Sequence, residues 1–500
     1  MRKFFLLVLF SVLIISCSKE VKINGVVKGG SPLERIEFID ASGVATLPLT
    51  NIGLDEKGNF KGSFDAPRNG MYAMTYAGQI AFVYLKKGQE FNISGEAGMF
   101  PNLFNITGAA KANNDYYKKV QNSMDGYMSK LNMSMIAKDE KSFLAEMKKV
   151  EADLNKVIED EAKTLKPDSE VVQLKKDELI TSILTFMGQY EENHGEATGK
   201  ENFKVSAAFK EYMKSLEKDN DRFVKTLPTY RNYLLGKLSM DFQNYAMAQN
   251  DKSTATMSQI FARYIKDQKD MSQTTKDYLL AFVIAKFDLN PFSENVDKLK
   301  KLVDDNIKDS VIKKDMHLAI DAVFGMKKGV DAPGTALVTL DGKSAKLTDS
   351  KDKPTLVMTY ASWNPYIAES IIPVLKEVNN FYKSKVNFAF VNLDDTKEQF
   401  TKTSNAMLKG ISGTNYYAEG GLNSQFAKDY FIYGFKIPGF FIIDKNGKIA
   451  SETFYNLGEP KFVEAMNKVS GLKAPTEAPN VQLTPDMMQM QSGAEAAASK

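Results

Sequence analysis

The sequence predicts a multi-domain protein with a small antiparallel β domain at the N-terminus, an all-α middle region and a C-terminal α/β domain. Its 500 residues exceed what one hydrophobic core organises, and roughly 150 residues per domain suggests about three units. Apolar residues alternate up to about residue 95 and follow a helical period from about residue 113. After residue 329 they gather into strands separated by helices.

The composition is typical of a folded protein, with 43% hydrophobic and 25% charged residues. The formal net charge of +3 includes Arg2 and Lys3, which lie in a segment that we expect to be removed. The remaining chain is close to neutral, whereas binding to nucleic acid needs a strongly basic surface. We therefore expect no nucleic-acid partner.

The first sixteen residues have the pattern of an export signal. A basic start is followed by an apolar run over residues 4–15, which is too short to span a bilayer comfortably. The tetrapeptide Ile14-Ile15-Ser16-Cys17 resembles a bacterial lipobox, which implies a signal peptide over residues 1–16 and a lipid on Cys17. The alternative is an ordinary secretory signal in which Cys17 is incidental.

The lipobox resemblance also predicts where the protein is located. Ser18, unlike an aspartate there, resembles the residue that permits transfer to the outer membrane. We expect a lipid-anchored protein of the cell envelope, at the outer membrane, on the periplasmic face or the cell surface. Cys17 is the only cysteine, so the exported chain has no free thiol.

Residues 17–105 are predicted to form the β-rich domain, because short alternating runs such as Val21-Lys22-Ile23 are separated by glycine turns. Residues 110–328 are predicted to be helical, with seven or eight helices. One helical face carries Met147, Val150, Leu154 and Val157 at alternating spacings of three and four. Such stripes usually fill cores between helices, and the alternatives are a ligand groove or a homodimer interface.

Residues 329–473 are predicted to form the α/β domain, with strands at 355–360, 386–391 and 440–443. Asn446-Gly447 favours a tight turn that closes a hairpin at the edge of the sheet. Residues 474–500 lack the apolar density needed to offset the entropy of ordering, so we expect a disordered tail.

This domain carries four motifs in order, and together they resemble a TlpA/ResA-type thioredoxin-like domain of the AhpC/TSA redoxin superfamily. The motifs are Asp331-Ala332-Pro333-Gly334 with Leu340-Asp341-Gly342-Lys343, then Ala361-Ser362-Trp363, then Ile437-Pro438, and finally the run from Ile443 to Ile449. The resemblance implies a thioredoxin-like fold, with a cis-proline at Pro438.

Members of that family continue after the tryptophan with Cys-x-x-Cys, whereas this chain has Asn364-Pro365-Tyr366-Ile367. Neither Asn364 nor Ile367 can form a mixed disulfide, and no thiol is available for peroxide chemistry. The redox motif is therefore degenerate, and we expect no enzyme, no catalytic residue and no cofactor.

Two interpretations of this motif remain open. Asparagine is a favoured helix N-cap and proline a favoured first helical residue, so Asn364 and Pro365 would only start a helix. Alternatively, Trp363, Asn364 and Tyr366 would form a groove with Ile437 and Pro438, where active relatives bind an extended polypeptide.

No metal site is expected from the remaining polar residues. His194 lies at a polar break and is predicted to be exposed, while His317 is predicted to be half-buried on a helix. The pair Asp394-Asp395 follows a strand and is expected to cap or turn the chain rather than to bind a cation.

We therefore expect a membrane-anchored envelope lipoprotein whose redox-inactive thioredoxin-like domain acts as a binding or scaffold module. Its partner would be a polypeptide or another envelope protein. One alternative is a non-catalytic subunit of a thiol-disulfide oxidoreductase complex. A second alternative is a surface lipoprotein in nutrient uptake.

Overall fold

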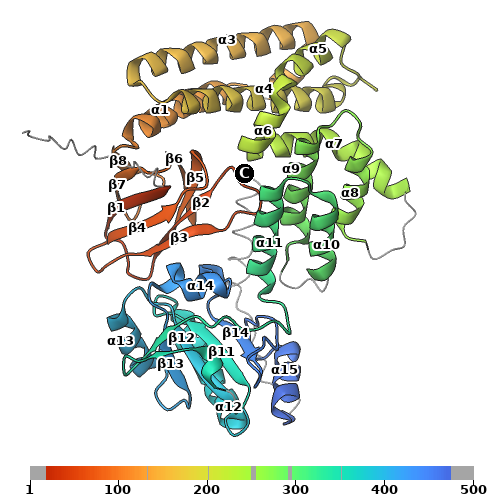
Figure 1. Ribbon diagram of the computed structural model, residues 1–500. Coiled ribbons are helices and arrows are strands. Elements are labelled where there is room, and N and C mark those ends of the chain that lie inside the picture. Colours follow the sequence, from red (N-terminus) through yellow and green to blue (C-terminus); the bar gives the residue numbers. More distant parts are fainter. Residues whose placement is uncertain are drawn as a thin grey trace, which may run out of the picture.

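A computed structural model describes residues 19–131, 133–200, 202–248, 255–290, 296–350 and 352–474. The three predicted kinds of structure are all present. The β domain lies between the helices of residues 111–198 and the α/β domain, and the helices of residues 273–324 lie beside it (Figure 1). The predicted signal peptide and Cys17 lie outside the described residues, as does the predicted tail from residue 475. Those features stay predictions.

The β domain consists of two four-stranded sheets packed face to face, with strand orders β4-β1-β7-β8 and β3-β2-β5-β6. Neighbouring strands are antiparallel as predicted, except that β1 and β7 are parallel. Phe38 and Phe64 stack between the sheets with ring centroids 5.6 Å apart. The strands are β1 (Glu20–Lys28), β2 (Arg35–Asp40), β3 (Pro48–Gly53), β4 (Asn59–Asp65), β5 (Gly70–Tyr76), β6 (Gln79–Leu85), β7 (Glu90–Glu96) and β8 (Asn105–Gly108).

The middle region is helical as predicted, but the described part contains eleven α-helices rather than seven or eight. They are α1 (Lys111–Met128), α2 (Met133–Ile136), α3 (Glu140–Leu165), α4 (Ser169–Thr198), α5 (Ala207–Leu216), α6 (Asn220–Thr226), α7 (Pro228–Ala248), α8 (Met257–Lys266), α9 (Gln273–Val283), α10 (Val296–Asn306) and α11 (Ser310–Phe324). The prediction was wrong because short helices such as α2 and α6 continue the apolar stripe of their neighbours, and periodicity alone does not separate them.

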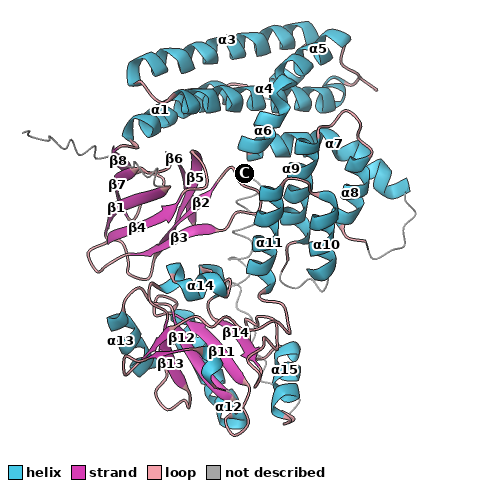
Figure 2. Ribbon diagram, in the orientation of Figure 1, coloured by secondary structure: helices cyan, strands magenta, loops and turns pink. Residues whose placement is uncertain are grey.

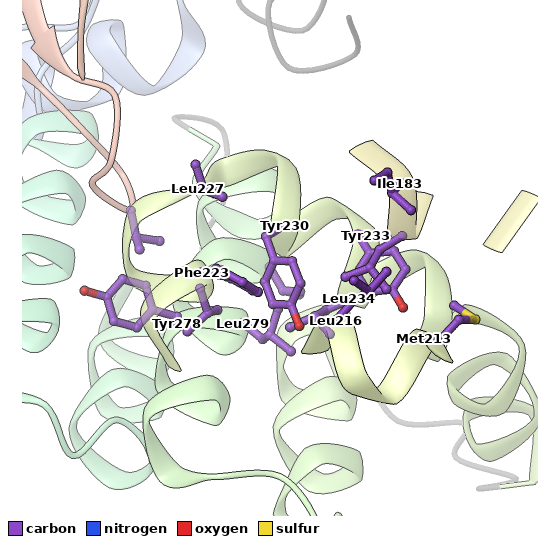
Figure 3. Packing of buried hydrophobic residues seen from close by; sticks show 14 of the residues in the cluster. Ile183, Met213, Leu216, Phe223, Leu227, Tyr230, Tyr233, Leu234, Tyr278 and Leu279 are labelled. Atoms are coloured by element: carbon purple, nitrogen blue, oxygen red, sulfur yellow. The ribbon is translucent and has the colours of Figure 1, made fainter. Parts of the chain in front are cut away.

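The methionine, phenylalanine and tyrosine stripes of this region largely fill its core. Met147, Val150 and Leu154 of α3 are buried, whereas Val157 is half-buried and Ile158 takes the core position. Figure 3 shows the core around α6, α7 and α9, where the rings of Phe223 and Tyr230 meet edge to face at 5.1 Å.

His194 contradicts the prediction of an exposed side chain. It is only 1% exposed, because α4 continues through the Asn193-His194-Gly195 stretch instead of ending there. Its Nδ1 lies 2.7 Å from the carbonyl oxygen of Ile136, and its ring packs against Tyr190 and Phe203. His317 is half-buried as predicted and lies 2.8 Å from Asp304.

The α/β domain has a six-stranded sheet of order β10-β9-β13-β12-β11-β14, with helices on both faces (Figure 2). Strands β11, β12 and β13 are parallel, and β14 runs antiparallel to β11. Its elements are β9 (Leu337–Thr339), β10 (Ser344–Ala345), β11 (Thr355–Tyr360), α12 (Ile372–Tyr382), β12 (Asn387–Asn392), α13 (Lys397–Met407), β13 (Thr414–Tyr417), α14 (Gln425–Asp429), β14 (Gly439–Ile443) and α15 (Pro460–Ser470). The turn at Asn446-Gly447 is present, with Gly447 at positive φ.

One buried arginine joins the β domain to the helices. Arg231 of α7 is fully buried, and its guanidinium donates to the carbonyl oxygens of Ser42 and Gly43 in the β domain. It also donates to the carbonyls of Val224 and Lys225 in α6. Because these four hydrogen bonds join the buried guanidinium to both domains, Arg231 holds the segments together. Among the described residues, no helix is both long and apolar enough to cross a membrane.

Candidate functional site: the mouth of the α/β domain

The sheet brings the two halves of the degenerate motif together. Strand β11 leads into Trp363 and Asn364, and Ile437-Pro438 leads into β14. Because β11 and β14 are antiparallel neighbours, with Thr359 opposite Gly439, both segments lie at the same edge of the sheet. The peptide bond before Pro438 is cis, as the resemblance implied. We call the region formed by Trp363, Asn364, Tyr366, Ile437 and Pro438 the mouth.

Asn364 occupies the position of the attacking cysteine, and its side chain reaches across the mouth. Its Nδ2 donates a hydrogen bond of 2.9 Å to the carbonyl oxygen of Ile437. Pro365 begins the helical segment as predicted, but the side chain of Asn364 contacts Ile437 rather than the amides of its own helix. The amide therefore links the two segments that form the mouth.

The other motif positions are closed to solvent to different degrees. Ile367, at the position of the resolving cysteine, is fully buried in the domain core within a π-helical turn (Ile367–Ile371). Tyr366 is half-buried, and burial raises the pKa of its hydroxyl. Pro438 and Ile437 are also buried. The mouth is thus a packed region rather than an open cleft.

Asp394 fixes the turn that carries Trp363. Its Oδ1 accepts a 2.6 Å hydrogen bond from the backbone N–H of Ser362. Its Oδ2 accepts bonds of 2.9 Å from Asn392 and Thr403. The Asp394 carboxylate is fully buried and both its oxygens accept from protein donors, so Asp394 stabilises the turn after β12.

The β domain covers the mouth through Arg35 of β2. The guanidinium forms a bidentate pair with Asp395, with Nη1–Oδ2 and Nη2–Oδ1 distances of 2.5 and 2.8 Å. It also lies 5.2 Å from the centre of the Trp363 ring, within the range of a cation–π interaction. Only 9% of the Arg35 side chain is exposed, whereas 35% of the Asp395 side chain is, so the guanidinium is largely buried and the carboxylate partly faces water.

A second contact closes the outer edge of β3 against the α/β domain. The side-chain amide of Asn423 accepts from the backbone N–H of Asn51 at 3.0 Å and donates to the Asn51 carbonyl at 2.8 Å. Glu37 accepts a 2.6 Å bond from the Asn51 side chain. Burial raises the pKa of Glu37, and the Asn51 hydrogen bond and the Arg35 charge partly offset that rise.

The sequence interpretation missed Arg35, Asn51, Asp395 and Asn423 as parts of this site. Arg35 and Asp395 are 360 positions apart, and nothing local to either residue indicates the other. Trp363, Asn364, Tyr366, Ile437 and Pro438 were placed at the mouth from sequence motifs.

Two buried polar atoms near the mouth have no hydrogen-bond partner among the described residues. They are the Nε1 of Trp363 and the Nζ of Lys436. Lys436 precedes Ile437, and burial lowers its pKa to about 7 although Asp321 of α11 opposes the shift. Within the described ranges, no cluster of three or more potential metal ligands is present.

Comparison with known proteins identifies the α/β domain. Residues 329–452 match the model of the AhpC/TSA family. No curated protein matches the chain. Among solved structures, the C-terminal domain of a protein described as a thiol-disulfide oxidoreductase from Bacteroides thetaiotaomicron is 27% identical, with 29% of this chain and 97% of that chain covered and a TM-score of 0.26.

Two further solved structures match the same part of the chain. One is described as a thiol:disulfide interchange protein DsbE from Chlorobium tepidum, with 24% identity, coverage of 29% and 99%, and a TM-score of 0.25. The other is a thiol-disulfide oxidoreductase from Bacteroides fragilis, with 21% identity, coverage of 26% and 93%, and a TM-score of 0.23. The C-terminal part of the chain is thus an AhpC/TSA redoxin domain that resembles thiol-disulfide oxidoreductases, in a protein with a single cysteine and no Cys-x-x-Cys pair.

Proposed function

We propose that this protein is a membrane-anchored envelope lipoprotein whose redox-inactive thioredoxin-like domain is a binding and scaffold module. The lipobox-like sequence at Cys17 supports the anchor. The observation that supports the binding and scaffold role is the packing at the mouth, where Arg35 of the β domain packs on Trp363 and pairs with Asp395. The place where relatives carry their redox cysteines is used here to hold another domain.

The chemistry of the mouth supports a non-enzymatic role. Dithiol exchange proceeds by attack of a thiolate and a mixed disulfide, and neither an amide at position 364 nor a hydrocarbon at position 367 can take part. The Asn364–Ile437 hydrogen bond gives the former attacking position a structural partner instead.

The packing of the mouth supports the chain's own β domain as the partner of this module. A bidentate arginine–carboxylate pair is among the stronger polar contacts, and here its guanidinium also packs on the Trp363 ring. An external polypeptide at Trp363 would have to displace Arg35. The role as a non-catalytic subunit of a redox complex and the role in nutrient uptake remain alternative hypotheses.

The test uses Trp363, the only tryptophan, as a reporter of the mouth. We expect Arg35→Ala to increase quenching of the tryptophan fluorescence by acrylamide, because the guanidinium no longer covers the ring. Lys22→Ala, on exposed β1 surface of the same domain, is the matched control and should leave quenching unchanged. Equal quenching in Arg35→Ala and wild type would contradict docking at the mouth.

A second measurement tests the absence of redox activity. The purified exported chain should not catalyse insulin reduction by dithiothreitol, and reproducible turnover would contradict the redox-inactive role.

A third experiment tests the lipid anchor. Cells expressing the wild type should incorporate labelled palmitate into the protein, and Cys17→Ser should abolish the label. Labelling of the Cys17→Ser variant would contradict the anchor at that residue.

A further inference from the structure

The outer strand β6 of the second β sheet has an open edge. This sheet has the order β3-β2-β5-β6, so one side of β6 pairs with β5 and the other side faces away from the sheet. Proteins usually protect such edges with charged residues, with proline or with a covering element, since an open edge can pair with another chain. The exposed half of β6, from Gln79 to Phe82, contains neither a charged residue nor a proline.

One end of this edge is already hydrogen-bonded, and the contact shows which backbone groups of the strand point away from the sheet. The side-chain amide of Asn114 in α1 accepts from the backbone N–H of Tyr84 at 2.8 Å and donates to the Tyr84 carbonyl at 2.9 Å. Backbone groups of alternate residues in a strand point the same way. The N–H and C=O groups of Phe82 and Ile80 therefore also point outward, where they have no backbone partner among the described residues.

The side chains at this open end are apolar and exposed. Phe82 is 53% exposed and Ile80 is 39% exposed, whereas Tyr84 on the same face is buried against the helical core. Ala81 and Phe82 line a cavity of about 2980 Å³, whose other walls include Phe104 beside β8, Met124 of α1 and Phe186 of α4. There is room for a chain segment beside the strand.

We propose that the open edge of β6 at Ile80 and Phe82 binds an extended polypeptide segment of a partner protein, which adds to the sheet as a further strand. Unpaired backbone donors and acceptors at strand spacing are complementary to an extended backbone. Such a segment continues the row of bonds that Asn114 begins at Tyr84, so the new contact extends an existing interface. An apolar side chain of the partner covers Phe82.

The test measures binding of a fluorescein-labelled peptide of alternating threonine and valine, flanked by lysines, to the full exported chain in detergent. Fluorescence anisotropy should show saturable binding by the wild type. Phe82→Pro removes an outward N–H that does not pair with β5, so proline is tolerated there, and it should weaken binding about tenfold or more. The same peptide with every amide N-methylated should not bind, because it has no N–H on either edge to donate to the strand.

Matched variants separate this site from non-specific adhesion. Phe82→Thr keeps the backbone groups and should weaken binding by only a few-fold, whereas Phe435→Thr changes an equally exposed phenylalanine of the α/β domain and should have no effect. Circular dichroism of each variant checks folding. The proposal is overturned if the wild type does not bind the peptide, if Phe82→Pro binds as tightly as wild type, or if light scattering shows that β6 instead pairs with a second copy of the chain.

Discussion

At position 364 an amide stands where relatives carry a reactive sulfur, and the two groups behave differently. The charge of a cysteine sulfur depends on pH, and its oxidation state depends on the redox state of its surroundings. The amide of Asn364, by contrast, is uncharged at all physiological pH values. Its hydrogen bond to the Ile437 carbonyl therefore persists under conditions that would change the protonation or oxidation state of a thiol. The contact gives the mouth a fixed geometry.

Replacement of Asn364 should show what this hydrogen bond contributes. Asn364→Ala leaves the Ile437 carbonyl without its donor, and we expect the free energy of unfolding to fall by about 1 kcal/mol. Asn364→Asp places a negative charge opposite the carbonyl, so the loss at pH 7 should be larger. Part of it should return below about pH 4, where the carboxyl is protonated and can donate. Urea unfolding at both pH values measures this, and equal stability of all three proteins would contradict it.

Lys436 should make stability depend on pH in a predictable direction. Burial lowers its folded-state pKa to about 7, below the ordinary value of 10.5 that applies to the unfolded chain. Between pH 7 and pH 10 the unfolded state binds the extra proton, so folding stability contributed by this group rises with pH and is lowest below pH 7.

Lys436→Met removes that titration. We expect the variant to be more stable than wild type at pH 7, by about 2 to 4 kcal/mol, with the difference shrinking toward pH 10. Denaturant unfolding at pH 7, 8.5 and 10 gives the comparison. A difference that stayed constant with pH would show that the lysine is charged in the folded protein.

At the scale of elements, the same kind of contact binds one residue at each edge of one sheet. Asn423 pairs with the backbone of Asn51 on β3, and Asn114 pairs with the backbone of Tyr84 on β6. A primary amide offers one donor and one acceptor in nearly the geometry of a peptide group, so it can end a ladder without adding a strand. Each edge is therefore joined to a different neighbouring domain.

The two asparagines should act independently. Asn423→Ala is expected to accelerate hydrogen exchange at the Asn51 amide and not at Tyr84, whereas Asn114→Ala should do the reverse. The reason is that each variant removes the acceptor of one amide only, which raises the frequency of local opening. Exchange measured by mass spectrometry of peptides from β3 and β6 makes each variant the control for the other. Acceleration at both edges in either variant would indicate global rather than local loosening.

The types of element could be predicted from the sequence, and several of their details could not. The β, helical and α/β parts were predicted because alternation and helical spacing are local properties of the chain. The helix count and the burial of His194 were missed, because chain breaks and burial depend on tertiary packing. For the same reason Asn364 and Pro438 were placed at the mouth by motif, but Arg35 was not.

At the scale of the whole molecule, the β domain is held from two sides. Arg231 of α7 binds the carbonyls of Ser42 and Gly43, and Asp395 and Asn423 of the α/β domain bind Arg35 and Asn51. Figure 1 shows the resulting arrangement, with the β sheets between α1, α3 and α4 on one side and the α/β domain on the other, and with α11 beside them. Movement of the α/β domain relative to the helices therefore requires that one of these contacts breaks.

Replacing Arg231 should weaken the link between the helices and the β domain. Arg231→Met removes the donor of four carbonyl groups, two of them in fully buried contacts, and we expect the free energy of unfolding to fall by about 3 kcal/mol or more, with separate unfolding of the two parts. Arg263→Met, at an exposed position of α8, is the control and should change stability by less than about 0.5 kcal/mol. Differential scanning calorimetry detects both effects, and a single unchanged transition in Arg231→Met would argue against the link.

The pair between Arg35 and Asp395 also constrains the order in which the chain can assemble. The two residues are 360 positions apart, so the mouth cannot close until the ribosome has made the chain beyond residue 395. Until then β3 has an uncovered edge while the helices are still being synthesised. Contacts this distant in sequence form slowly, since a long loop must close first. A newly made chain therefore passes through a stage at which its β domain is complete but unshielded, and a chaperone would have most to protect at that stage.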